Sequence, residues 1–365
     1  MVRKTTARYF IGMSIVLVVA LIAGCGGGGD TGVPAISQGR WGHTATLLED
    51  GRVLIVGGQE TPSRKLDTAE IFDPSTGLWS AAGSMAEKRG SGQRAVLLED
   101  GRVLVLGEND DASAEIYDPS TGQWSSAGVM LKARQWPSAT LLEDGRVLVA
   151  GGSDATKAGL LELNTAEIYD PSTGEWIETG SMEQIHAGHS AVVVDGKVLV
   201  VGKYMAETYD PSTGTWSPAG KPVRERALGT TADVLEDGKV LVTGGQFQQG
   251  GWSGVVVPVR TVEIYDPSSG TWAEVSSMNE ARENHTSVQL EDGKVMIIGD
   301  QATEIYDQAT DEWTSTGIMK RSRGVLSTAT LLNDGRVLIV GGKHDTDDGL
   351  RGVADVEIYD PATGW

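Results

Sequence analysis

Seven basic side chains recur at one position of a repeated unit in the 365-residue sequence, and together they could bind an anion. Each unit also carries a glutamate further along the chain, for example Glu70, Glu167 or Glu263. Because arginine pairs with carboxylates through two parallel hydrogen bonds, Arg–Glu ion pairs are the alternative to an anion receptor, and the interpretation that we favour. The seven remain candidate ligand-binding residues: Arg40, Arg89, Arg134, His186, Arg226, Arg282 and Arg323.

Three histidines, His43, His189 and His285, occupy equivalent positions just before a repeated apolar strand. A zinc site would hold its ligands within about 2.1 Å of one ion, whereas equivalent positions in separate units are spread apart. We therefore expect no metal and no cofactor. The three histidines are kept as candidate ligand-binding residues.

Three tryptophans lie outside the repeat, at Trp41, Trp136 and Trp252. An exposed aromatic ring can stack on the apolar face of a sugar or anchor a protein partner. The alternative is that each ring packs against its own loop. We therefore include these three residues among the candidates for contact with a glycan or a protein.

The elements that position these side chains follow from the repeat itself. Each unit contains two short apolar runs separated by Asp-Gly, then a Glu-Ile-Tyr run and an Asp-Pro-Ser-Thr-Gly turn. These sequences suit two tight turns between strands, so each unit is expected to form four antiparallel strands. A tryptophan follows the second turn in every unit and is expected to be core: Trp79, Trp124, Trp176, Trp216, Trp272, Trp313 and Trp365.

This pattern resembles the kelch repeat, in which a glycine pair ends strand two and a tyrosine and a tryptophan follow at set distances. Glycine pairs occur at 57–58, 151–152, 244–245 and 341–342, and the second glycine is replaced by Glu108, Lys203 and Asp300 in the other units. The resemblance covers residues 33–365. It implies an all-β, seven-bladed kelch-type β-propeller with four-stranded antiparallel blades.

Ring closure needs one further strand, because the sequence stops at Trp365, where strand four of the seventh blade should begin. Residues 33–40 align with the end of strand four in the other units. We therefore predict that an N-terminal strand at 33–36 pairs with 357–359 and completes blade seven, which would remove an exposed sheet edge. The alternative is a truncated chain.

A propeller has two faces, and the sequence distinguishes them. The one–two and three–four connections share one face and are nearly constant in sequence. The two–three and four–one connections share the other, which we call the variable face, and differ from unit to unit. Binding residues are concentrated on loops held by a rigid scaffold, so the variable face is the predicted binding face.

The charge balance excludes one class of partner. The chain has 30 Lys and Arg residues against 50 Asp and Glu residues, a formal net charge of −20. Such a chain is not expected to bind the phosphate backbone of a nucleic acid.

The first 24 residues carry Arg3, Lys4 and Arg8 ahead of an apolar run that is too short to span a membrane, as in a secretory signal peptide. The segment from Leu21 to Cys25 resembles the bacterial lipobox, which implies cleavage before Cys25 and acylation of its thiol. Residues 25–32 then form a Gly-rich tether. Gly26, the residue after the cysteine, implies sorting to the outer membrane of the bacterial envelope.

Together these features predict a lipid-anchored envelope platform that binds a glycan or a protein and contacts the membrane through its anchor alone. The alternative is a carbohydrate-modifying enzyme such as a sugar epimerase, although no motif singles out an acid–base pair. Galactose oxidase, also a kelch-type propeller, needs a cysteine crosslinked to a tyrosine. The only cysteine here is Cys25, in the signal region, so a copper-radical site is not expected. A non-catalytic role is therefore favoured.

Overall fold

The computed structural model describes residues 32–109, 111–154, 156, 161–184, 186–226, 228–249, 255–347 and 349–365. Every helix or strand assigned in these ranges is a β-strand. Accordingly, the described residues contain no helix with the length and apolar character needed to cross a membrane. The predicted signal peptide at 1–24, the tether up to residue 31, Cys25 and Trp252 lie outside the described residues.

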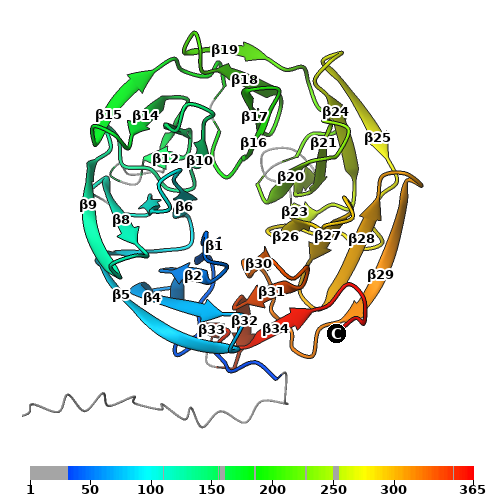
Figure 1. Ribbon diagram of the computed structural model, residues 1–365. Helices are drawn as coiled ribbons and strands as arrows, with labels where there is room; N and C mark the ends of the chain where they lie inside the picture. Colours follow the sequence, from blue (N-terminus) through cyan, green and yellow to red (C-terminus); the bar gives the residue numbers. More distant parts are fainter. Residues whose placement is uncertain are drawn as a thin grey trace, which may run out of the picture.

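Seven antiparallel sheets surround a central channel as the blades of a β-propeller (Figure 1). The strands are given from the channel outwards. Blade one consists of β1 (Thr44–Leu47), β2 (Val53–Val56), β4 (Arg64–Asp73) and β5 (Leu78–Arg89), and blade two of β6 (Arg94–Leu97), β7 (Val103–Leu106), β8 (Ser113–Asp118) and β9 (Gln123–Val129). Blade three consists of β10 (Ser138–Leu141), β11 (Val147–Ala150), β14 (Ala166–Asp170) and β15 (Glu175–Thr179), and blade four of β16 (Ser190–Val194), β17 (Lys197–Val201), β18 (Ala206–Asp210) and β19 (Thr215–Pro218).

The ring continues through three more blades. They consist of β20 (Thr230–Val234), β21 (Val240–Gly244), β24 (Val262–Asp266) and β25 (Thr271–Val275); β26 (Thr286–Gln289), β27 (Val295–Ile298), β28 (Ala302–Asp307) and β29 (Glu312–Ile318); and β30 (Thr328–Leu331), β31 (Val337–Val340) and β34 (Val356–Tyr359). The predicted seven-bladed, all-β architecture is therefore confirmed.

Blade three shows how the repeat forms this structure. Strand two, β11, is fully buried, and its apolar residues pack toward both neighbouring blades. The Asp170 carboxylate accepts hydrogen bonds from the Ser172 N–H and hydroxyl, which fixes the turn before the tryptophan. The Trp176 ring then lies 4.8 Å from that of Tyr169, and its indole N–H donates to the Ala127 carbonyl of blade two at 2.8 Å. The repeated tryptophan therefore joins neighbouring blades.

The N-terminal segment binds to the seventh blade but does not supply the predicted fourth strand, so this blade has three strands. The described residues 33–36 form no strand. Instead, the Ile36 N–H donates to the Ala354 carbonyl, and the Arg40 N–H donates to the Val353 carbonyl, both at 3.1 Å. Ile36 is buried in the core between blades seven and one. Hydrogen bonds just before β34 and one buried side chain therefore replace the expected pairing with 357–359.

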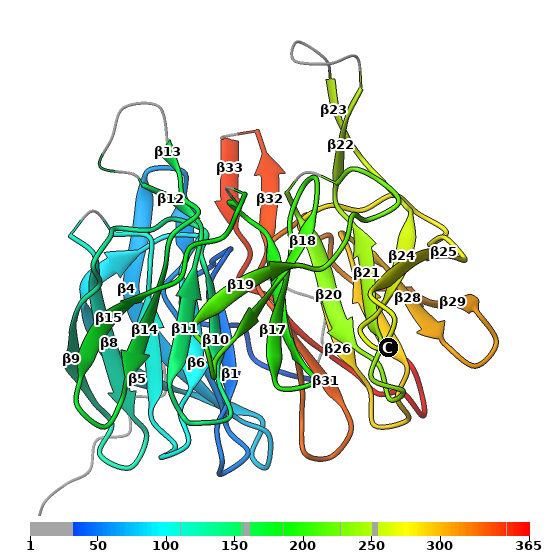
Figure 2. The ribbon, with the colours of Figure 1, turned by 90° about the horizontal axis from the view of Figure 1, so that it is seen from above.

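Long two–three connections fold into additional hairpins on the variable face. They belong to blades one, three, five and seven, and Figure 2 shows them extending beyond one end of the ring. These hairpins contain β3 (Gln59–Thr61), which pairs with β4; β12 (Ser153–Asp154) with β13 (Leu161–Glu162); β22 (Gln246–Gln249) with β23 (Val255–Pro258); and β32 (Lys343–Thr346) with β33 (Gly349–Gly352). The variable face is therefore uneven around the ring.

Candidate functional site

The basic residues in the four–one connections point into the protein rather than toward solvent. Arg134 is the clearest case: its Nε donates to the Glu167 carboxylate at 2.7 Å. Its Nη1 donates to the Gly151 and Thr165 carbonyls at 2.8 Å each. The guanidinium therefore ties the four–one connection to the end of strand two and the start of strand three in the same blade.

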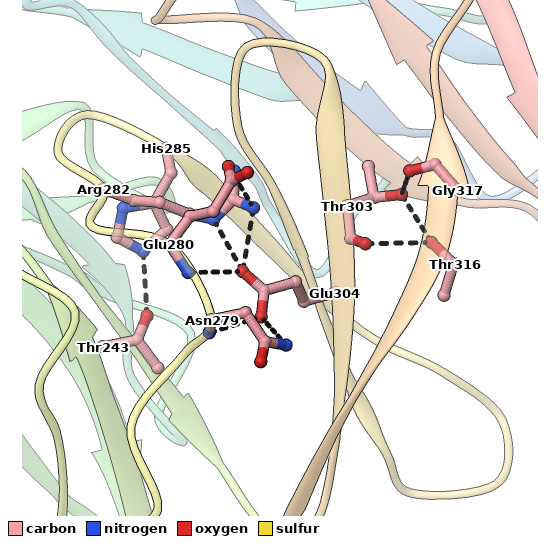
Figure 3. Close-up of polar contacts among 9 residues, drawn as sticks. All are labelled: Thr243, Asn279, Glu280, Arg282, His285, Thr303, Glu304, Thr316 and Gly317. Carbon is pink, nitrogen blue, oxygen red and sulfur yellow. Dashed lines mark hydrogen bonds and ion pairs between the residues drawn. The ribbon is translucent and has the colours of Figure 1, made fainter.

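The same arrangement recurs in the other blades. The buried ion pairs are Arg40–Glu70, Arg89–Glu115, Arg226–Glu263, Arg282–Glu304 and Arg323–Glu357, and His186 contacts Glu207 at 3.1 Å in blade four. Each glutamate also accepts a backbone N–H from the connection, as Glu304 does from Asn279 at 2.7 Å (Figure 3). We call these arginines and His186 the clamp residues.

The clamp residues correspond to the ion-pair alternative rather than to an open anion receptor. Their side chains are almost completely buried, and burial lowers the pKa of Arg40 and Arg323 while their glutamates oppose this shift. An arginine whose donors are already bound to carbonyls and a carboxylate has little left to offer a ligand. The predicted ring of cations is therefore an internal structural device.

The predicted tryptophans lie in different environments. Trp41 is only 4 % exposed, because its backbone pairs with Gln59 in the first hairpin and draws the ring into the protein. The buried ring agrees with the alternative, in which this tryptophan packs inside the protein. Trp136 is half-buried and lines the mouth of the channel, where its backbone takes a φ of 58°. Positive φ is costly for a large side chain and is often found at functional sites.

The predicted histidines are also at the channel, and each binds the preceding blade. The Nε2 atoms of His43 and His189 lie 2.9 Å from the hydroxyls of Thr328 and Ser138, and that of His285 lies 2.8 Å from the Thr243 hydroxyl (Figure 3). Burial lowers the pKa of each imidazole to about 3, with a smaller contribution from nearby basic residues. The three rings are therefore neutral at physiological pH.

These positions surround a cavity of about 420 Å³ where the channel opens on the variable face. The lining combines the three histidines with hydroxyls, two amides and the Trp136 ring, including Thr44, Gln93, Ser190, Thr230, Asn284, Thr286 and Thr328. A concave site with a few convergent polar groups is the usual setting for a ligand. The channel mouth and the surrounding hairpins are therefore the candidate functional site.

Two features of this site were missed from the sequence. Arg94, the first residue of β6, also lines the cavity. Six blades have serine or threonine at this position, so a comparison of the seven strand-one sequences would have revealed it. The exposed apolar side chains of the β22–β23 hairpin were missed too, although the Val255–Val257 run was visible outside the repeat.

The cavity offers little for acid–base catalysis. A general acid or base works best when its pKa is near the working pH, and imidazoles with a pKa of about 3 remain neutral bases throughout that range. Among the residues that the structure describes, no group of three His, Cys, Asp or Glu side chains is placed to hold a metal ion.

Comparison with known proteins identifies the repeat. A family model of the kelch motif matches residues 50–86, 144–183, 186–222 and 237–279, so the chain carries kelch repeats. The Kelch-like protein terF of Aspergillus terreus is 32% identical over 30% of this chain and 26% of its own length. Human Kelch-like protein 23 is 26% identical over 54% of this chain and 35% of its own length. The match therefore spans about a quarter to a third of these relatives.

A solved structure agrees with the fold. A fungal alcohol oxidase of the AA5 family, in complex with copper, superposes with a TM-score of 0.68 over 87% of this chain and 74% of its own. The two sequences are 20% identical, so the likeness concerns the fold alone.

Proposed function

We propose that this kelch-repeat propeller is a non-catalytic platform that binds a protein partner on its variable face. The observation that carries the proposal is the β22–β23 hairpin, which exposes Phe247, Val255 and Val256. Phe247 pairs with Val257 and lies on the same side of the hairpin as Val255. Val255 is 70 % exposed. Projecting apolar side chains are typical anchors of protein interfaces.

Other exposed apolar residues lie on the neighbouring blades of the same face. Leu161 is on the hairpin of blade three, Tyr204 is in the two–three connection of blade four, and Leu228 precedes strand one of blade five. The hairpin of blade seven, by contrast, carries Lys343, His344, Asp345 and Arg351. We therefore place the docking surface on blades three to five and call it the apolar arc. This asymmetry favours a protein with a complementary apolar segment.

We also propose that the platform is held at the bacterial envelope by acylation of Cys25. The proposal rests on the lipobox resemblance of the segment from Leu21 to Cys25. Two or more acyl chains give stable anchoring, since each buried methylene contributes about 0.8 kcal/mol. Metabolic labelling with an alkyne fatty acid tests this step: the wild-type chain should be labelled and Cys25→Ser should not. A labelled Cys25→Ser chain, or an unlabelled wild-type chain, would contradict it.

The docking surface is tested by site-specific photocrosslinking in cells. A photoreactive residue at Val255 should give a defined protein adduct, and Phe247→Asp in the same chain should abolish it. The control is Arg351→Ser on the blade-seven hairpin, which should leave the adduct unchanged. Loss of the adduct in both variants, or in neither, would argue against the apolar arc.

A further inference from the structure

Arg94 departs from the repeat at the innermost ring of the propeller. The first strand of every blade borders the channel, and six blades carry a hydroxyl where β6 carries this arginine. The six equivalent residues are Thr44, Ser138, Ser190, Thr231, Thr286 and Thr328. Four of these six residues line the channel-mouth cavity together with Arg94, namely Thr44, Ser190, Thr286 and Thr328.

Unlike the clamp arginines, Arg94 forms no ion pair with the described part of the chain. Its Nη1 donates to the Gln93 carbonyl at 2.8 Å, which leaves Nε and Nη2 without a bonded acceptor in these residues. Glu108 is the carboxylate that acts electrostatically on Arg94, and it is already paired with Lys65, whose Nζ lies 3.3 Å away. Burial lowers the pKa of Arg94, with Glu108 opposing the shift. Arg94 is half-buried at the wall of the channel mouth, so a carboxylate in the cavity can reach the donors that have no acceptor in these residues.

The neighbouring blade provides a second unsatisfied group. Thr44 holds the equivalent position on β1, beside β6, and its buried hydroxyl has no hydrogen-bond partner. Trp136 lines the cavity as well, and its backbone N–H donates to the carbonyl of Gly92, two residues before Arg94. Arg94, Thr44 and Trp136 therefore all line one cavity of about 420 Å³.

We propose that the channel mouth binds a small organic monocarboxylate. Its carboxylate pairs with the Arg94 guanidinium and accepts a hydrogen bond from the Thr44 hydroxyl. Two parallel N–H donors match a planar carboxylate. The remaining Ser and Thr hydroxyls favour a ligand that carries hydroxyl groups, so a hydroxy acid fits better than an unsubstituted acid. This site lies inside the channel and is separate from the apolar arc.

The charge of the site selects a monoanion over phosphate or sulfate. Arg94 is the only residue with a permanent charge that lines the cavity in the described part of the chain. The lining histidines are neutral, Glu108 lies nearby, and the whole chain carries −20. A second negative charge on the ligand would therefore have no cation to meet it.

Ligand-observed NMR and calorimetry on the purified full-length chain test the proposal with acetate, glycolate, gluconate, sulfate, phosphate and glucose as probes. The hydroxy acids should bind more tightly than acetate, while sulfate, phosphate and glucose should bind at least tenfold more weakly. Arg94→Thr, which installs the residue of four other blades, should weaken hydroxy-acid binding at least tenfold. Thr44→Val should weaken it by about three- to tenfold.

Two further variants separate recognition from folding. Arg94→Lys keeps the positive charge but not the paired donors, so its affinity should fall between those of wild type and Arg94→Thr. Arg102→Thr removes an exposed arginine that pairs with Asp100 at the opposite end of the same blade, and should bind as wild type does. Absent hydroxy-acid binding, equal binding in Arg94→Thr, or tighter binding of sulfate or phosphate would each overturn the proposal.

Discussion

Gly42 donates its backbone N–H to the carbonyl oxygen of Leu326 at 2.8 Å, which joins the first blade to the seventh at the channel mouth. The Leu326 N–H in turn donates to the Asn284 carbonyl at 3.1 Å, and the Gly188 N–H donates to the Trp136 carbonyl at 3.2 Å. Leu326, Asn284 and Trp136 all have positive φ, a conformation that is costly without glycine. Backbone hydrogen bonds between blades therefore impose this strain around the candidate site.

The closure of the ring makes Ile36 a critical core residue. Its side chain occupies the place of a buried methionine that ends strand four in other blades, such as Met130 or Met182, and is 3 % exposed. We expect Ile36→Ala to lower the free energy of unfolding by about 2 to 4 kcal/mol, because it leaves a cavity between blades seven and one. Chemical denaturation followed by tryptophan fluorescence measures this loss.

The matched control is Ile36→Met, which installs the residue of the other blades and should cost less than about 1.5 kcal/mol. If Ile36→Ala unfolded at the same denaturant concentration as wild type, the N-terminal segment would not contribute to closure.

The fold was predictable because it is encoded seven times. The Asp-Gly turn, the buried Val-Leu runs and the Tyr–Trp pair each have a local signature, so their strands were assigned correctly from the sequence. The pairing of residues 33–36 was not, because it occurs once and depends on contacts between the ends of the described chain. A single non-repeated segment has no internal comparison to fix its register.

The candidate site was only partly predictable, for a similar reason. Spacing alone placed the arginines on the variable face, but burial depends on the Gly151 and Thr165 carbonyls that their guanidinium groups meet in space. The burial of Trp41 likewise follows from its pairing with Gln59. Arg94 replaces the serine or threonine that the other six blades carry at this position, so an analysis based on the repeated residues overlooks it.

The clamp arginines should matter far more for stability than the exposed arginines of the opposite face. Arg134→Met removes the cation from Glu167, a fully buried carboxylate, and should cost about 3 to 5 kcal/mol of unfolding free energy. Arg146→Met, which breaks the exposed pair with Asp144, should cost less than about 1 kcal/mol. Urea denaturation of both variants makes the comparison.

A double variant distinguishes an ion pair from simple packing. Arg134→Met with Glu167→Gln removes the uncompensated charge, so it should recover part of the loss seen in Arg134→Met alone. Additive losses in the double variant would count against a clamp that acts through charge.

The neutral histidines should make the protein sensitive to acid. Their folded-state pKa of about 3 lies below the ordinary value of 6.5. Their contribution is therefore complete above pH 6.5 and is lost as the pH falls toward 3. Between pH 8 and pH 4.5, replacing His43, His189 and His285 with glutamine should shift the stability difference from wild type in favour of the variant, by roughly 2 to 3 kcal/mol for each residue. Urea denaturation at pH 8 and pH 4.5 gives the difference.

Glutamine is the appropriate replacement because Gln93 already holds the equivalent position in blade two, where its amide donates to the Val56 carbonyl. The triple variant should therefore fold, and its advantage over wild type should grow on acidification. A constant difference between the two pH values would show that the imidazoles do not titrate in this way.

The titration of Asp233 should lower the stability of the protein as the pH rises, whereas that of the histidines lowers it as the pH falls. This β20 residue is half-buried between blades five and six. Its carboxylate accepts a hydrogen bond from the Ser287 hydroxyl at 2.8 Å, and its other oxygen is buried without a partner in the described residues. Burial raises its pKa to about 6, above the unfolded value near 3.9, so its stabilising contribution is complete below pH 4 and is lost as the pH rises through 6.

Asp233→Asn should therefore increase the unfolding free energy at pH 8 by roughly 2 to 3 kcal/mol relative to wild type. It should leave stability at pH 4 nearly unchanged, because the wild-type carboxyl is then already neutral. Denaturation of the two proteins across this pH range isolates the titration of this group, since all other carboxylates are common to both. Parallel stability curves would mean that Asp233 is not protonated in the folded protein near pH 5.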